Sequence, residues 1–241
     1  MLLKQQESAV AYASRTLRAA KLEIEGAVRV SCSPAFVPVL MRMMLPKVRA
    51  KHPLLTIEFS GDYRAVDLAK GEADIAVRMS RPNELDLVAR QAFACGWCVY
   101  ASKAYLAARG LPSSVDALSS HNLVLYVEAM HSVAPLRWME AYRGGPTQIA
   151  RVDNLEIASQ LMASGGGIGV LPCFIGEAMA ELVRVFPEPI AFNTGWIVYH
   201  EAVRNSVRVR ATVDALAEFF IGHGPHFSGR GQTGAEAVPG E

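Results

Sequence analysis

In the first eighty residues, stretches with strand-like spacing of apolar residues alternate with stretches of helical spacing. This order constrains the fold more than any other feature of the sequence. Apolar residues alternate along the chain, as they do in strands, in the stretches 27–31, 55–59 and 73–79. Between these stretches the spacing predicts a helix over 37–48, kinked at Pro46, and a second helix that Asp62 caps and Gly71 ends. A strand-helix-strand-helix-strand order implies a parallel sheet, and so an α/β fold.

The second half repeats this α/β pattern on a smaller scale. The predicted strands are 123–127, 148–152, 168–171 and 196–200. The predicted helices are 102–109, 135–142, one that Asn154 caps, and 209–220. A chain of 241 residues that is 51% hydrophobic can form two such lobes. Extended segments between 85 and 100 would join the lobes, and we expect a ligand cleft between them.

The first 25 residues carry a heptad pattern. Its apolar positions are Leu3, Val10, Leu17 and Ile24. We predict a helix over 1–25 that pairs with another helix for dimerisation and ends at Gly26. A single amphipathic helix lying on its own domain is the alternative.

The opposite end, residues 223–241, is rich in glycine and polar residues and lacks periodicity. We predict a disordered tail there. His223 and His226 resemble a metal-binding pair, but no cysteine or acid stands near them at ligand spacing. We therefore expect no metal site and no cofactor.

The charge balance limits the partners of this chain. Lys and Arg number 24 against 23 Asp and Glu, a net charge of +1, which argues against a bulk electrostatic binder of DNA or membranes. No stretch reaches the roughly 18 apolar residues of a membrane helix. Four cysteines without an export signal indicate a reducing, cytoplasmic location.

Two motifs suggest chemistry that their surroundings do not support. Cys95 and Cys98 form a C-x-x-C motif inside a strand pattern, so they point to opposite faces, and a disulfide would need a bulge at Gly96. We interpret both as buried apolar residues. The glycines of 165–169 follow a helix and lead into a strand, the reverse of a phosphate loop. With no catalytic motif in view, we expect no enzyme.

Four stretches in order resemble one known family. These are 26–34 followed by Leu45-Pro46, then 67–78, then 101–110 with Lys103 where proline is usual, and 162–172. Together they resemble the effector-binding domain of LysR-type transcriptional regulators, over about residues 10–221.

The resemblance implies a two-lobed fold like type 2 periplasmic binding proteins, with a ligand cleft between the lobes and an N-terminal linker helix. Lobe I would comprise 26–98 and 200–222, and lobe II 99–199. The family carries a winged helix-turn-helix before the linker helix. Nothing in this sequence encodes one, so we expect the chain to contact promoter DNA only through a domain absent from it. A protein truncated to its sensor is the favoured explanation, and an incomplete gene product the alternative.

The cleft should be lined by residues at strand ends and helix starts. Ser31, Cys32 and Ser33 end the first strand and begin a helix at Pro34, where free N–H groups favour an anion, although Ser33 could simply cap the helix. Arg78 could pair with a carboxylate or form a structural salt bridge with Asp74. By resemblance the further effector-binding positions are Met79, Ser80, Tyr126, Val127, Asn154, Leu171 and Pro172.

These expectations describe a sensor that controls transcription. A small effector, an organic or aromatic acid, would bind between the lobes and alter the geometry of a homodimer or homotetramer. The alternatives are a solute-binding protein of a transport system, which would need export, and an enzyme such as a small lyase, which would need a catalytic cluster.

Overall fold

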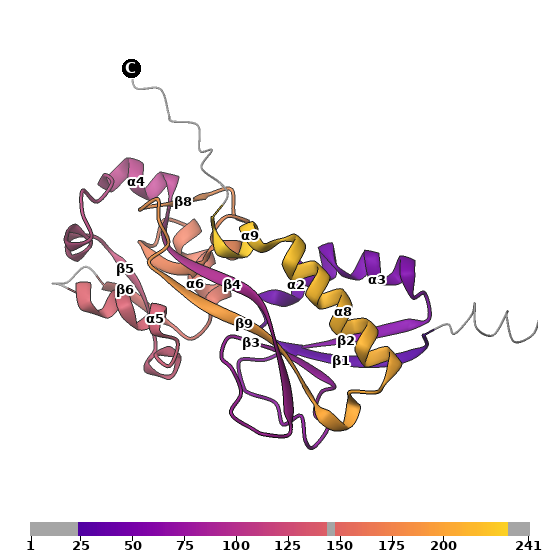
Figure 1. The fold of residues 1–241 in the computed structure, drawn as a ribbon. Helices are drawn as coiled ribbons and strands as arrows, with labels where there is room; N and C mark the ends of the chain where they lie inside the picture. The colour runs from indigo at the N-terminus through magenta and orange to yellow at the C-terminus, as the bar shows by residue number, and fades with distance from the viewer. Residues whose placement is uncertain (1–23, 144–147, 231–241) are drawn as a thin grey trace, which may run out of the picture.

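The computed structural model describes residues 24–143 and 148–230 (Figure 1). Three of the predicted dimerisation residues, Leu3, Val10 and Leu17, lie outside these residues. Ile24 lies inside them. It is not helical, and its side chain packs against the core of the first lobe. Gly26, with φ at 99°, is the first residue of strand β1.

One long sheet runs through the molecule in the strand order β2-β1-β3-β9-β4-β7, with β8 paired to β4. Its strands are β1 (Gly26–Cys32), β2 (Leu55–Gly61), β3 (Ile75–Arg78), β4 (Leu87–Ser102), β7 (Gly169–Pro172), β8 (Leu182–Arg184) and β9 (Ala191–His200). Strand β1 is parallel to both β2 and β3, which confirms the predicted parallel sheet. The other pairings are antiparallel.

The first lobe is built around an aromatic core. Helices α2 (Phe36–Met43), α3 (Leu45–Lys51) and α8 (Val207–Gly222) lie on one face of the sheet (Figure 1). Pro46 stands in the first turn of α3 and breaks the predicted helix at Met44. The rings of Phe93 and Phe220 stack with centroids 4.2 Å apart. Such pairs contribute beyond the apolar area they bury.

The predicted helix between Asp62 and Gly71 is wrong, because residues 62–74 form a loop. Acidic side chains there accept hydrogen bonds from the backbone: Asp62 from the N–H of Arg64, and Glu72 from that of Asp67. Such local bonds compete with helical ones. The crossover from β2 to β3 therefore lacks a helix.

The second lobe has a smaller parallel sheet, β5 (Leu123–Tyr126) with β6 (Gln148–Val152), beside β7. Its helices are α4 (Lys103–Arg109), α5 (Ala134–Trp138), α6 (Leu155–Ala163) and α7 (Cys173–Gly176). Short 3-10 helices η1 (Asp116–Ser120), η2 (Glu128–Met130) and η3 (Met139–Tyr142) connect them. Asn154 caps α6, as predicted, and Ser102, expected as the first residue of a helix, caps α4. Aliphatic side chains such as Leu136 and Val170 dominate this core.

Strands β4 and β9 cross from one lobe to the other side by side (Figure 1). Along β4, Phe93 and Cys95 belong to the first core, whereas Trp97 belongs to the second. On β9, Ile197 packs in the first core, and the 3-10 helix η4 (Glu201–Val203) then leads to α8. The lobe boundaries given above stay a prediction.

The chain does not become disordered at residue 223. Residues Gly224–Ser228 form helix α9, and its Phe227 is completely buried in the aromatic core. The predicted tail therefore begins too early. An apolar side chain packed among five other phenylalanine rings outweighs the glycine-rich composition around it. No helix in the described ranges is long and apolar enough to cross a membrane.

Candidate ligand-binding site

A cavity of about 80 Å³ lies between the two cores. The first lobe contributes the start of α2, the β2–β3 loop and the end of β3, and the second contributes η2, α5, α6 and β7. The lining residues are Ser33, Ala35, Phe36, Tyr63, Met79, Cys95, Trp97, Met130, Val133, Leu136, Leu155, Pro172 and Phe174. Its walls are therefore almost wholly apolar, and both lobes supply them.

Tyr63 joins the lobes at one edge of this cavity. It lies in the loop after β2, yet its hydroxyl donates to Glu156 Oε2 at 2.7 Å and accepts from the Leu155 N–H at 3.2 Å, both at the start of α6. Burial and the nearby Glu156 carboxylate raise the pKa of Tyr63 above its ordinary value. The hydroxyl therefore stays protonated and can keep donating to the carboxylate.

Three buried polar atoms at or beside the cavity lack a hydrogen-bond partner in the described structure. They are the Ser33 hydroxyl, the Trp97 indole N–H and the second oxygen of Glu156, Oε1. Ser33 and Trp97 line the cavity, and Glu156 is the residue that Tyr63 contacts. Leaving a buried polar group unpaired costs about 1–3 kcal/mol, so these atoms favour a ligand that would pair with them.

Three of the predicted effector-binding residues, Ser33, Met79 and Pro172, line the cavity. Ser31, Cys32, Tyr126 and Leu171 are each at most 4% exposed and are not among its lining residues. Tyr126 donates its hydroxyl to the Val170 carbonyl at 2.9 Å.

The remaining predicted residues are not among those that line the cavity. Arg78 donates to the Val66 carbonyl at 2.8 Å and lies 3.9 Å from Glu84, so its acidic neighbour is Glu84 rather than Asp74. Asn154 uses its side chain to cap α6. Val127 is half-buried, and Ser80 is exposed.

Sequence reasoning missed the two most informative side chains, Tyr63 and Trp97. Trp97 stands inside the C-x-x-C motif of a predicted strand, where its spacing marks no ligand contact, and Tyr63 lies in a segment expected to be helical. An aromatic residue two positions after the carboxyl end of a parallel strand was the available signal for Tyr63. The sequence carries no signal that pairs Tyr63 with Glu156, which lies ninety-three residues away.

The C-x-x-C motif is buried, and its two thiols are not joined to each other. Cys95 packs in the first core and Cys98 in the second, consistent with opposite faces of one strand. Cys98 instead lies 3.5 Å from Cys173, measured between the sulfur atoms. Within residues 24–143 and 148–230, no group of three or more His, Cys, Asp or Glu side chains could hold a metal ion.

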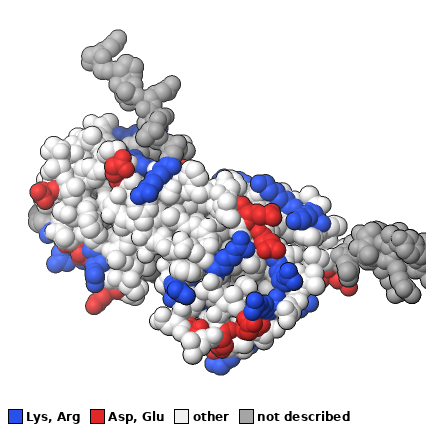
Figure 2. Space-filling model, viewed as in Figure 1, with Lys and Arg blue, Asp and Glu red and all other residues white. Residues whose placement is uncertain are grey.

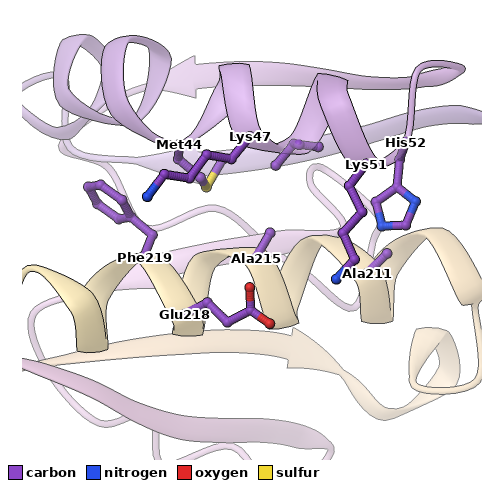
Figure 3. Close-up of a pocket in the computed structure, with 9 residues that line it drawn as sticks. Met44, Lys47, Lys51, His52, Ala211, Ala215, Glu218 and Phe219 are labelled. Atoms are coloured by element: carbon purple, nitrogen blue, oxygen red, sulfur yellow. The ribbon is translucent and has the colours of Figure 1, made fainter.

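A second cavity of about 120 Å³ lies on the first lobe between α3 and α8 (Figure 3). Met44, Val48, Ala211, Ala215 and Phe219 form its apolar floor. Lys47 and Lys51 extend from α3 toward α8, where Glu218 faces them (Figure 3). All its walls belong to one lobe.

The surface seen in Figure 2 shows basic and acidic side chains interspersed on the first lobe and a broad uncharged area on the second. Charges of one sign do not gather on this face. It therefore has no strongly basic patch of the kind that binds nucleic acid.

Comparison with known proteins agrees with this architecture. The model of the LysR substrate binding domain matches residues 22–220. The transcriptional regulator DmlR of Escherichia coli is 27% identical over 212 residues, which cover 85% of this chain and 68% of that protein. A Haemophilus influenzae HTH-type regulator is 30% identical over 174 residues, 68% of this chain and 59% of the relative.

Solved structures show the same fold. CrgA, a LysR-type regulator of Neisseria meningitidis, is 25% identical with a TM-score of 0.70, over 90% of this chain and 76% of that one. The effector domain of AmpR from Pseudomonas aeruginosa is 19% identical with a TM-score of 0.66, over 83% and 97%. This family consists of regulators rather than enzymes, and its domains have the type 2 periplasmic-binding-protein-like fold. The chain belongs to the LysR family of transcriptional regulators, as an effector-binding domain.

Proposed function

We propose that this chain is the ligand-sensing and oligomerisation region of a cytoplasmic LysR-type regulator, and that its effector binds in the cavity between the lobes. The cavity itself carries the proposal: its walls come from two separate cores, and buried polar atoms without partners lie at it. A ligand that contacts both lobes can favour one arrangement over another, by no more than its differential affinity for the two.

The lining favours an aromatic acid over a small polyanion. The residues found to line the cavity include no lysine, arginine or histidine. A carboxylate would instead accept hydrogen bonds from Ser33 and Trp97, while the ring packs on Phe36 and Phe174. The carboxylate must stay away from Glu156, which would repel it.

Entry of such a ligand must widen the cavity. Its volume, about 80 Å³, is smaller than the roughly 150 Å³ apolar cavity that holds benzene. The Tyr63 contacts to α6 lie at the edge that would separate. Effector binding therefore stretches or replaces them, and the lobes rotate relative to each other.

This motion would act on transcription through oligomer geometry. A linker helix before Ile24, with Leu3, Val10 and Leu17 on its seam, would pair two chains, and side-by-side lobes would give a dimer or, with both contacts, a tetramer. Promoter DNA would be bound by a winged-helix domain outside this chain.

Thermal unfolding of the chain against a panel of aromatic and aliphatic carboxylic acids tests the proposal. A ligand at about 100 times its dissociation constant adds roughly 2.7 kcal/mol of stability. That corresponds to a rise in Tm of about 5–10 °C for a chain of this size.

Substitutions then locate the site. Ser33→Ala combined with Trp97→Phe should abolish the shift, and Ser33→Ala with Asn154→Ala should weaken it. Ser164→Ala, an exposed serine after α6, is the matched control and should leave the shift unchanged. Undiminished binding in the Ser33 and Trp97 variant would show that the effector binds elsewhere. A monomeric chain that binds solutes without any change in oligomer geometry would favour the alternative, a transport solute-binding protein.

A further inference from the structure

Two of the four buried cysteines lie in contact directly behind the wall of the interlobe cavity. Cys98 lies in β4 and Cys173 begins α7, and their sulfur atoms are 3.5 Å apart. Their sequence neighbours Trp97, Pro172 and Phe174 all line the cavity. A disulfide brings two sulfur atoms to about 2.05 Å, so an approach of about 1.5 Å would join them.

The C-terminal segment covers this pair. Gly229 fits so closely that a Cβ atom there would lie 2.5 Å from the Cys173 sulfur, and one at Gly96 would lie 3.2 Å from it. Arg184 donates to the Gly229 carbonyl at 2.9 Å and pairs with Glu177. Opening of α9 and Gly229 would therefore give small solutes access to the sulfur atoms.

The surroundings make Cys173 the more reactive thiol. The sulfur–sulfur contact with Cys98 and the nearby Arg184 guanidinium lower the pKa of Cys173, while the same contact and burial raise the pKa of Cys98. By contrast, burial raises the pKa of Cys32 to about 12, and it raises that of Cys95 as well. Disulfide formation begins with attack by a thiolate, and a lowered pKa increases the fraction of Cys173 in that form.

We propose that Cys98 and Cys173 form a reversible disulfide in response to a hydroperoxide, and that this modification reshapes the effector cavity. The Cys173 thiolate attacks the peroxide, forming an S–O bond as the O–O bond breaks and hydroxide or alkoxide leaves. Cys98 sulfur then attacks the Cys173 sulfur, and water leaves with the Cys98 proton. Two electrons pass from the sulfurs to the peroxide, and a reducing dithiol reverses the step.

The effect on the cavity follows from the connectivity. Closing the bond draws Cys173 toward β4 and moves Pro172 and Phe174 with it. The ring of Phe174 stacks on that of Phe36 with centroids 4.8 Å apart, and its centroid lies 5.2 Å from that of Phe227 in α9. A shift of Phe174 must therefore move these neighbouring rings. This second part of the proposal rests on the proposed function of the cavity, whereas the disulfide itself does not.

The first test counts thiols in the full 241-residue chain after treatment with hydrogen peroxide. The protein is then denatured, free thiols are alkylated, and the intact mass is measured. We expect two of the four thiols to be protected, the mass of two hydrogen atoms to be lost, and a peptide linking Cys98 to Cys173. Dithiothreitol should restore all four.

Variants identify the pair. Cys98→Ser and Cys173→Ser should each abolish the protected pair, whereas Cys95→Ser, the matched control on the same strand, should retain it. The proposal would be overturned if two thiols remain protected in Cys98→Ser or Cys173→Ser. It would also be overturned if the native chain still has four free thiols after peroxide treatment. Because this readout needs no effector, it can fail or succeed independently of the proposed function.

A second measurement tests access and coupling. Phe227→Ala, which loosens α9, should form the disulfide faster than the native chain, and an unchanged rate would overturn the covering role of this helix. Tryptophan fluorescence should change on oxidation and revert with dithiothreitol, and Trp97→Phe should remove most of that change. A disulfide that forms without any change in fluorescence would overturn the coupling to the cavity.

Discussion

The two cavities of this molecule differ in whether one lobe or both lobes form their walls. This difference decides whether a ligand bound there can respond to the arrangement of the lobes. The interlobe cavity takes its walls from both cores and has buried, unpartnered polar atoms at it. The cavity between α3 and α8 is larger, at about 120 Å³ against 80 Å³, but lies on one lobe and is edged by lysines, a histidine and a glutamate.

Size is therefore the weaker indicator of function here. A ligand between α3 and α8 would touch elements of one core and could not distinguish two arrangements of the lobes. A ligand in the interlobe cavity contacts both cores and can. The predictions below test this difference, beginning with the largest expected effect.

Phe227→Ala tests whether the wall of the interlobe cavity is supported from behind by α9. The ring is fully buried against Phe36 and Phe174, both of which line the cavity. Its loss should lower the free energy of unfolding by about 3–5 kcal/mol, as for other buried phenylalanines, measured by urea denaturation. Ile221→Ala, 69% exposed at the end of α8, should cost less than about 0.5 kcal/mol. Equal small losses would show that α9 is not part of the core.

Filling each cavity in turn compares them directly. Val133→Phe places a ring in the interlobe cavity and should abolish the Tm shift that an aromatic acid produces, a loss of about 2.7 kcal/mol of ligand stabilisation at 100 times Kd. Ala215→Phe does the same between α3 and α8 and should leave the shift intact. The reverse result would place the effector on the first lobe.

Tyr63→Phe removes the hydroxyl that joins the lobes. Both of its hydrogen bonds lie at a partly exposed edge, so we expect a loss of about 1 kcal/mol in unfolding free energy. The solution scattering profile of the unliganded protein should shift toward more open lobes. Tyr142→Phe, within the second lobe, is the control and should leave the profile unchanged.

The smallest expected effect is a pH dependence. Burial lowers the pKa of His226, on α9 behind the interlobe cavity, below its ordinary 6.5. His226 therefore takes up a proton more readily in the unfolded chain than in the folded chain. The free energy of unfolding falls as the pH drops from about 6.5 through the pKa of His226 in the folded chain. His226→Gln should flatten the curve of unfolding free energy in this range. A curve as steep as that of the native chain would contradict this assignment.

His121 gives the same test in the second lobe. Burial lowers its pKa too, and its Nδ1 lies 3.3 Å from the Tyr105 hydroxyl. His121→Gln should also flatten the curve, but it should not alter ligand binding, because His121 lies away from the cavity lining.

Much of the fold could be predicted because its signals are local. The apolar alternation of β1, the proline that breaks α2 from α3, and the Asn154 cap each act within a few residues. Prediction failed where distant or side-chain contacts decide the structure. Acidic side chains hold 62–74 as a loop, and Phe227 brings α9 into a core formed by residues far away in sequence.

The candidate site shows the same division. Ser33 could be predicted because a strand ends and a helix begins there, and Met79 and Pro172 because they stand at strand ends that the family resemblance implies as contact positions. Tyr63 and Trp97 were missed because their importance depends on the partners they meet, or fail to meet, across the cleft. The order of residue types along the chain does not indicate that the indole N–H of Trp97 is buried without a hydrogen-bond partner.

The pairing of β4 with β9 also has a consequence for protein engineering. Trp97 lies opposite Ala191 in the antiparallel register, so the chain leaves for the second lobe and returns from it at neighbouring positions. The second lobe is thus an insertion between adjacent points of one hairpin. A two-residue Asn-Gly turn could replace it and close the hairpin directly. The remaining first lobe, with a graft that again supplies an apolar side chain where Phe174 packs in its core, would be a scaffold for a different ligand-reading module.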